Sequence, residues 1–157
     1  MAATEGWNDW ADNDQLQVPN ISPHAEISLP KYIKTPCNIS QDDLQYLWDQ
    51  GALSIPDTSL KNALLLSYVD HVHPSLPLVN LHELLVMTSS KTTRRLLQEG
   101  RKISLLLFQA IMFAGSAFVD QLSLQMAGYS SRREARSILY QKVKACVVHM
   151  HKISLLT

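Results

Sequence analysis

The sequence predicts an all-α protein, an irregular array of several helices that follows a disordered acidic tail. Apolar residues recur at the i, i+3, i+4 spacing of a helix face, and no segment shows the sustained alternation of a strand. Side chains that suit helix N-caps stand just before these apolar stretches. Hydrophobic residues make up 46% of the 157 residues and charged residues 18%, which is typical of a folded domain.

Residues 1–27 are predicted to form the disordered acidic tail. Its first twenty residues have no apolar period, and two tryptophans lie there among four acids: Trp7, Trp10, Glu5, Asp9, Asp12 and Asp14. Three prolines within residues 21–37 indicate an extended or looped chain rather than a helix. We therefore expect the folded part to span residues 28–157.

The first helix is predicted to begin after Ser40, a suitable N-cap with Asp43 at the third helical position. Gly51 suits the end of this helix, and its apolar stripe comprises Leu44, Leu47 and Trp48. A second helix restarts after Pro56. Its apolar face comprises Leu60, Ala63, Leu64 and Tyr68.

Residues 64–85 predict a rigid, buried corner between two helices. Pro74 disfavours helix at His73, and Pro77 keeps the crossing extended. Asn80 can cap the next helix, predicted over residues 80–87, with Glu83 at the capping-box position. We interpret the corner as scaffold, with His73 a structural residue rather than a ligand. The corner residues are Tyr68, Val72, His73, Pro74, Pro77 and Leu78.

Two further helices complete the prediction, after a polar stretch that is loop or short helix as far as Leu97. The first covers residues 103–119, which are too few and too interrupted by polar residues for a membrane span. The second begins at Ser131, where Glu134 completes a capping-box pattern. Its predicted apolar stripe comprises Ala135, Ile138, Leu139, Val143, Cys146, Val147 and Met150.

The end of the chain predicts an incomplete domain. Ile153, Leu155 and Leu156 keep the last segment apolar as far as Thr157. An amphipathic helix needs a partner for its stripe, so we expect a truncated version of something longer. A frayed tail is the alternative.

The residue pattern predicts no enzyme, no metal site and no cofactor. Cys37 and Cys146 are far apart, and neither has a second Cys at ligand spacing, which also favours a reducing compartment over a disulfide framework. The histidines at 71 and 73, and those at 149 and 151, are two residues apart and point to different sides of a helix. No nucleophile motif or phosphate-binding glycine loop is present in the sequence.

Charge is distributed unevenly along a chain that is neutral overall. The first 50 residues carry eight acids against two lysines, so the remainder is net positive. Five cations fall on the last predicted helix: Arg132, Arg133, Arg136, Lys142 and Lys144. A phosphate-binding patch needs such charges, but a solvated face opposite the apolar stripe explains them better. Arg132 and Arg133 lie in the first turn, where the helix dipole disfavours cations, so an acidic partner would suit them.

Several motifs in order resemble one protein family. The segments are residues 29–34 (LPKYIK), 43–47 (DLQYL), 51–56 (GALSIP), the corner, the apolar helix at 105–118, and the set Arg133, Glu134, Ala135, Arg136, Tyr140, Lys144 and Ala145. Together they resemble the fungal-specific regulatory domain, or middle homology region, of zinc-cluster (Zn2Cys6) transcription factors. The subgroup is similar to cutinase-gene transcription activators. The family's six-cysteine DNA-reading cluster has no counterpart here, because the sequence holds two cysteines.

The resemblance implies a partial helical regulatory domain over residues 28–157, a nuclear location and a role in transcription regulation of a metabolic or biosynthetic gene set. Protein partners would be the transcription machinery or a longer related factor, with direct DNA binding doubtful and no membrane association. We interpret the segment with Trp7 and Trp10 as a disordered tail, and the alternative is that it contacts the transcription machinery. The alternative from a different class is a small helical binding or scaffold protein unrelated to transcription.

Overall fold

The computed structural model describes residues 29–34, 39–89, 100 and 102–155, with residues 153–155 described by backbone only. The acidic tail predicted over residues 1–27, Cys37, and nearly all of the polar stretch that ends at Leu97 lie outside the described residues. The regular secondary structure of the described part is almost entirely helical, which confirms the all-α prediction.

The first three helices begin where their caps predict. They are α1 (Gln41–Asp49), α2 (Thr58–Ser67) and α3 (Leu81–Thr88). Ser40 Oγ accepts from the Asp43 amide at 3.2 Å, and Asn80 Oδ1 accepts from the Glu83 amide at 3.2 Å. Asp57 caps α2 through the Ser59 amide at 2.9 Å. Each cap satisfies a backbone donor that the first helical turn leaves unpaired.

The helix predicted over residues 103–119 is shorter in the structure, and a further helix that was not predicted follows it. The helix α5 covers Leu105–Gly115, and a separate short helix α6 covers Gln121–Met126. Asp120 is the N-cap of α6 and accepts from the Ser123 amide at 2.8 Å. The last helix α7 runs over Arg132–Leu155.

A pair of two-residue strands was not predicted. Strands β1 (Ile33–Lys34) and β2 (Ile103–Ser104) pair in parallel, with Ile33 opposite Ile103. Ser104 then caps α5 through the Leu107 amide at 3.2 Å. The pairing ties the entry of the described chain to the start of α5, although about seventy residues separate the two strands in sequence.

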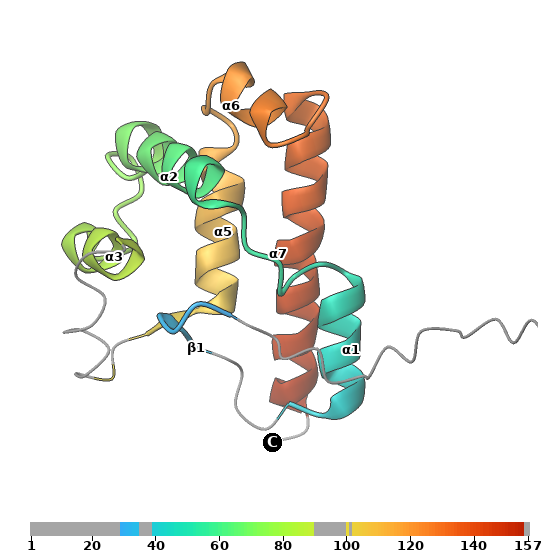
Figure 1. Cartoon of the computed structure of the whole chain (residues 1–157). Helices are drawn as coiled ribbons and strands as arrows, with labels where there is room; N and C mark the ends of the chain where they lie inside the picture. Colours follow the sequence, from blue (N-terminus) through green and yellow to red (C-terminus); the bar gives the residue numbers. More distant parts are fainter. Residues whose placement is uncertain (1–28, 35–38, 90–99, 101, 156–157) are drawn as a thin grey trace, which may run out of the picture.

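The helix α5 occupies the centre of the fold. In Figure 1 it stands beside α7, while α2 crosses its upper half and α1 lies against the lower part of α7. The two-strand pair lies at the lower end of α5. The largest fully buried apolar side chains come from five helices and the turn after α5: Leu47, Leu64, Phe108, Met112, Val119, Leu124 and Leu139.

The helices α2 and α5 come into backbone contact at Gly115. A Cβ atom placed on this glycine would lie 2.1 Å from the Leu64 carbonyl oxygen, which no real Cβ atom tolerates. A hydrogen atom in place of a side chain is therefore what allows the crossing.

Candidate interaction surface

The helix α7 carries two parallel stripes that are offset by one residue. The inner stripe is buried and includes two polar side chains: Ala135, Leu139, Lys142, Cys146 and His149. The outer stripe follows the same i, i+4, i+7, i+11, i+14 spacing and is mostly apolar: Arg136, Tyr140, Val143, Val147 and Met150. The predicted stripe mixed members of both. The fold buries only part of the predicted stripe, because the side chains of Ile138, Val147 and Met150 are exposed.

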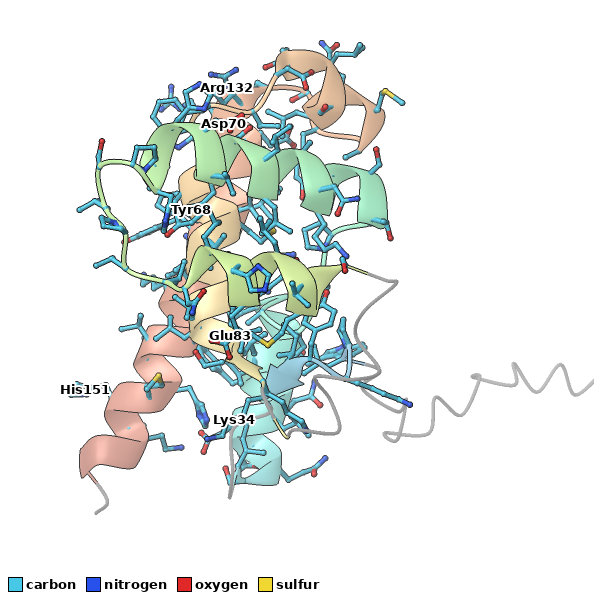
Figure 2. The ribbon with its side chains drawn as sticks, turned by 90° about the vertical axis from the view of Figure 1, so that its left-hand side faces the viewer. Lys34, Tyr68, Asp70, Glu83, Arg132 and His151 are labelled. Atoms are coloured by element: carbon cyan, nitrogen blue, oxygen red, sulfur yellow. The ribbon has the colours of Figure 1, made fainter. Side chains whose placement is uncertain are left out.

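The lower part of the outer stripe is exposed to solvent. Val147 is 49% exposed, Met150 is 54% exposed, and Val143 is half-buried. In Figure 2 the lower half of α7 forms the left edge of the molecule, and His151 projects outward from that edge. We call Arg136, Tyr140, Val143, Val147 and Met150 the α7 outer face. Its exposed apolar side chains make this stripe, on the longest described helix, a candidate contact surface.

An aromatic side chain of α5 extends this face. Phe113 is half-buried, and its ring centroid lies 5.7 Å from that of Tyr140. The Arg136 guanidinium carbon lies 5.4 Å from the centre of the Phe113 ring, a cation–π distance. The α7 outer face is therefore backed by α5 and held in a defined arrangement at its upper end.

Positive charge surrounds the α7 outer face. Arg133, Arg136 and Lys144 are exposed cations on α7. Glu134 is the acid of this helix, and its carboxylate accepts from the Ser130 amide at 2.7 Å. These hydrogen bonds from Ser130 lower the pKa of Glu134. A partner for the face would gain from negative charge.

The five cations predicted on the last helix do not share one role. Arg132 donates to the carbonyl oxygens of Ala117 and Val119 at 2.9 and 2.7 Å, so backbone oxygens rather than an acid accept from it. Lys142 was expected on a solvated face, but only 7% of it is exposed and its ammonium donates to the Ser54 carbonyl at 3.0 Å. Burial lowers its pKa. Arg132 and Lys142 therefore stabilise the fold.

Lys142 belongs to a buried polar contact that positions the turn after α1. Gln109 of α5 is fully buried, and its Nε2 donates to the Ala52 carbonyl at 2.7 Å and the Ser54 carbonyl at 3.3 Å. The turn carbonyls thus receive donors from both α5 and α7. This explains why two polar side chains occupy positions where an apolar stripe would place aliphatic ones.

The corner residues differ in burial. Tyr68 is buried and its ring lies 6.1 Å from that of His73. Pro74, Pro77 and Leu78 are exposed, Leu78 at 80%, so the expected burial of the corner is wrong for these three residues. The chain forms a π-helical turn, η1 (Tyr68–Val72), and the His73 amide donates to the Tyr68 carbonyl at 2.9 Å. His73 itself stays helical, with φ −57° and ψ −39°, because the widened turn ends the regular hydrogen-bond pattern before Pro74.

The thiol and imidazole groups of the described part of the chain include one buried thiol, Cys146, and one buried imidazole, His149. Burial raises the pKa of the Cys146 thiol to about 11, which keeps it protonated and unreactive. No group of three His, Cys, Asp or Glu side chains among the described residues could hold a metal ion. His149 is buried on the inner stripe, close to the ion pair between Asp43 and Lys152.

A pocket of about 420 Å³ lies between the entry of the chain and the start of α2. It is lined by Pro30, Tyr32, Trp48, Leu53, Ser54, Ile55, Pro56, Asp57, Thr58 and Lys61. The Lys61 ammonium lies 5.9 Å from the centre of the Tyr32 ring and donates to the Thr88 carbonyl at 3.3 Å. Burial lowers the pKa of Lys61, and Asp57 is used as the cap of α2. The lysine and the carboxylate that line this pocket, Lys61 and Asp57, therefore have structural roles.

Three curated fungal proteins are similar to this chain over most of its length. Cutinase transcription factor 1 beta of Fusarium vanettenii is 42% identical over 117 residues, which cover 74% of this chain and 13% of that protein. A transcription factor of Fusarium pseudograminearum (strain CS3096) is 34% identical over 149 residues, covering 86% and 16%. The transcription factor cpaR of Aspergillus oryzae is 36% identical over 142 residues, covering 83% and 23%.

The chain therefore spans less than a quarter of the length of each of these relatives. No family model matches the chain, and no solved structure matches it. Transcription factors as a class are generally not enzymes. Among the described helices, none is both long and apolar enough to cross a membrane.

Proposed function

This chain belongs to the fungal transcription factors related to cutinase transcription factor 1 beta and cpaR, and we propose that it regulates transcription through protein contacts made by the α7 outer face. The observation that carries the proposal is the second stripe of α7, where apolar side chains are exposed while Lys142 and His149 are buried. Apolar residues exposed along one face of a helix are most simply explained by a binding partner that covers them.

We propose further that residues 28–157 act as part of a helical regulatory domain, that the protein works in the nucleus, and that it has no catalytic activity. Its partner is a protein, either of the transcription machinery or a longer related factor. Two of the five cations predicted on the last helix, Arg132 and Lys142, already donate to backbone carbonyls, which supports protein contact over phosphate contact. Reading of a DNA sequence would then come from the partner.

A tethered reporter assay tests this proposal. The full chain is fused to an unrelated DNA-binding domain, and reporter output is compared with that of the DNA-binding domain alone. We expect the fused chain to change the output and the untethered chain to accumulate in the nucleus. Unchanged output together with an exclusively cytosolic protein would contradict the proposal and favour the helical scaffold protein.

A further inference from the structure

We propose that, in the free protein, the acidic tryptophan segment at residues 5–14 of this same chain occupies the α7 outer face. The inference deepens the proposed function and depends on it for the identity of the face. It names what covers the face when no partner is bound. A partner would then have to displace this segment, which makes access to the face a regulated step.

Charge complementarity favours this occupant. Residues 1–20 carry four acids and no Lys or Arg, for a net charge of −4. The α7 outer face includes Arg136, and Arg133 and Lys144 lie beside it. Opposite charges at the rim of an apolar contact guide association and fix its register.

The aromatic residues of the segment suit the apolar part of the face. Trp7 and Trp10 are the only tryptophans in the first 40 residues, and each can bury a large apolar area. Tyr140, Val147 and Met150 offer an aromatic ring, a branched aliphatic side chain and a thioether at successive turns. Arg136 already lies over the Phe113 ring, and indole is the best ring for a further cation–π contact.

The chain is long enough to reach the face. The described residues begin at Leu29, so fourteen residues separate Asp14 from the described part. Fourteen extended residues span about 45 Å at about 3.3 Å each. A folded domain of this size is about 30–40 Å across, from a radius of gyration of about 14 Å. The linker is therefore long enough to span the width of the domain.

A second copy of the chain fits the same face less well. In a two-fold contact the same patch meets itself, so the face with Arg136, and Lys144 beside it, would meet an equally positive face. Glu134 lies near the start of α7 and its carboxylate is bound to Ser130. Like charges placed opposite each other disfavour such a contact, whereas the acidic segment brings the compensating charge.

The fluorescence of the two tryptophans tests the proposal in the full chain. A Trp48→Phe background leaves Trp7 and Trp10 as the emitting residues. We compare acrylamide quenching of this parent chain with that of a synthetic peptide of residues 1–20. Into the parent we introduce Val147→Asp, or Val148→Asp as the matched control. Val148 is the next residue and is 46% exposed, but it points about 100° away from the α7 outer face.

We expect severalfold weaker quenching in the parent and in the Val148→Asp chain than in the free peptide. The Val147→Asp chain should be quenched like the peptide, because burying an unpaired carboxylate beside other acids weakens docking by about tenfold or more. Replacing Asp9, Asp12 and Asp14 by Asn should also release the tryptophans. The protection should not change on dilution.

Four results would overturn the inference. The parent could be quenched as strongly as the peptide, Val147→Asp could leave the quenching unchanged, or both Asp variants could raise it equally. Protection lost on dilution, with a dimer seen by sedimentation, would assign the face to a second copy. The reporter assay above is independent of this readout, since it measures output and not the position of Trp7 and Trp10. A responsive reporter with unprotected tryptophans would therefore remove only the docking inference.

Discussion

The contact between Gly115 and Leu64 gives a stability prediction whose size follows from one distance. In Gly115→Ala the new Cβ atom would lie 2.1 Å from the Leu64 carbonyl oxygen. Since a carbon–oxygen contact of about 3.3 Å is the closest that ordinary geometry allows, α2 and α5 must separate by roughly 1 Å. The obstacle is a backbone atom, so no change of rotamer relieves it. A gap of about 0.5–1 Å forfeits about a quarter to a half of the dispersion energy along the contact.

Overpacking a core costs about 1–3 kcal/mol, and the rigid obstacle places Gly115→Ala near the upper end of that range. The helix preference of alanine over glycine returns at most about 1 kcal/mol. We expect a net loss of about 2 kcal/mol, which lowers the urea midpoint by roughly 1 M or more at a slope of about 1.5 kcal/mol/M. Circular dichroism during urea unfolding measures it.

The neighbouring Ala114→Gly variant serves as the control for the helix term. It removes a methyl group from α5 without adding one at the crossing, and should cost about 1 kcal/mol. The reasoning would be refuted if Gly115→Ala were as stable as the parent or more stable, because the Leu64 carbonyl would then not lie against this glycine.

Three further predictions concern Lys142, Cys146 and Asp43. Lys142→Ala should destabilise the protein by about 1–3 kcal/mol through the lost charged hydrogen bond, while the exposed Lys144→Ala should change stability by less than about 0.5 kcal/mol in the same urea assay. Cys146 should resist alkylation at pH 8 until the protein unfolds, because burial holds its pKa near 11; mass spectrometry of its peptide checks this, and rapid alkylation of the native protein would argue against the burial. The Lys152 hydrogen bond lowers the pKa of Asp43, so its contribution to stability is present above the unfolded value of about 3.9 and is lost as the pH falls through the folded pKa. Carboxyl NMR titration should show a higher pKa of Asp43 in Lys152→Met. An unchanged pKa would show that Lys152 does not form an ion pair with Asp43 in solution.

Local signals in the sequence predicted where helices begin. Ser40, Asn80 and Ser131 act through side chains that reach amides only three residues away, so their caps depend on nothing distant. Even there one detail differs. The capping box of α7 predicted that Glu134 would return to Ser131, whereas its carboxylate accepts from the Ser130 amide.

Distant contacts decided what the sequence could not predict. The pairing of Ile33 with Ile103 joins segments about seventy residues apart, and two residues are too short to show an alternating pattern. Gly115 had no signal of its own, because its role depends on a backbone atom of another helix. Both features became visible only in the three-dimensional arrangement.

The sequence did not predict which side of α7 is buried, and the reason is chemical. Stripe analysis assumes that the buried side of a helix is apolar, but Lys142 and His149 lie on the buried side here. A search for two stripes offset by one residue would have found Tyr140, Val147 and Met150 as a separate set. The resemblance to fungal transcription factors came from the order of the motifs and did not depend on which side of α7 is buried. The family was therefore predicted correctly, while the α7 outer face was not predicted.

Reporter output from the tethered chain with Val147→Asp or Val148→Asp is the measurement that tests the central claim most directly. The two residues are adjacent and about equally exposed, and only Val147 belongs to the α7 outer face. If this face makes the contacts that regulate transcription, Val147→Asp should reduce output to the level of the DNA-binding domain alone, and Val148→Asp should retain the output of the parent chain. Equal output from the two variants would contradict the account.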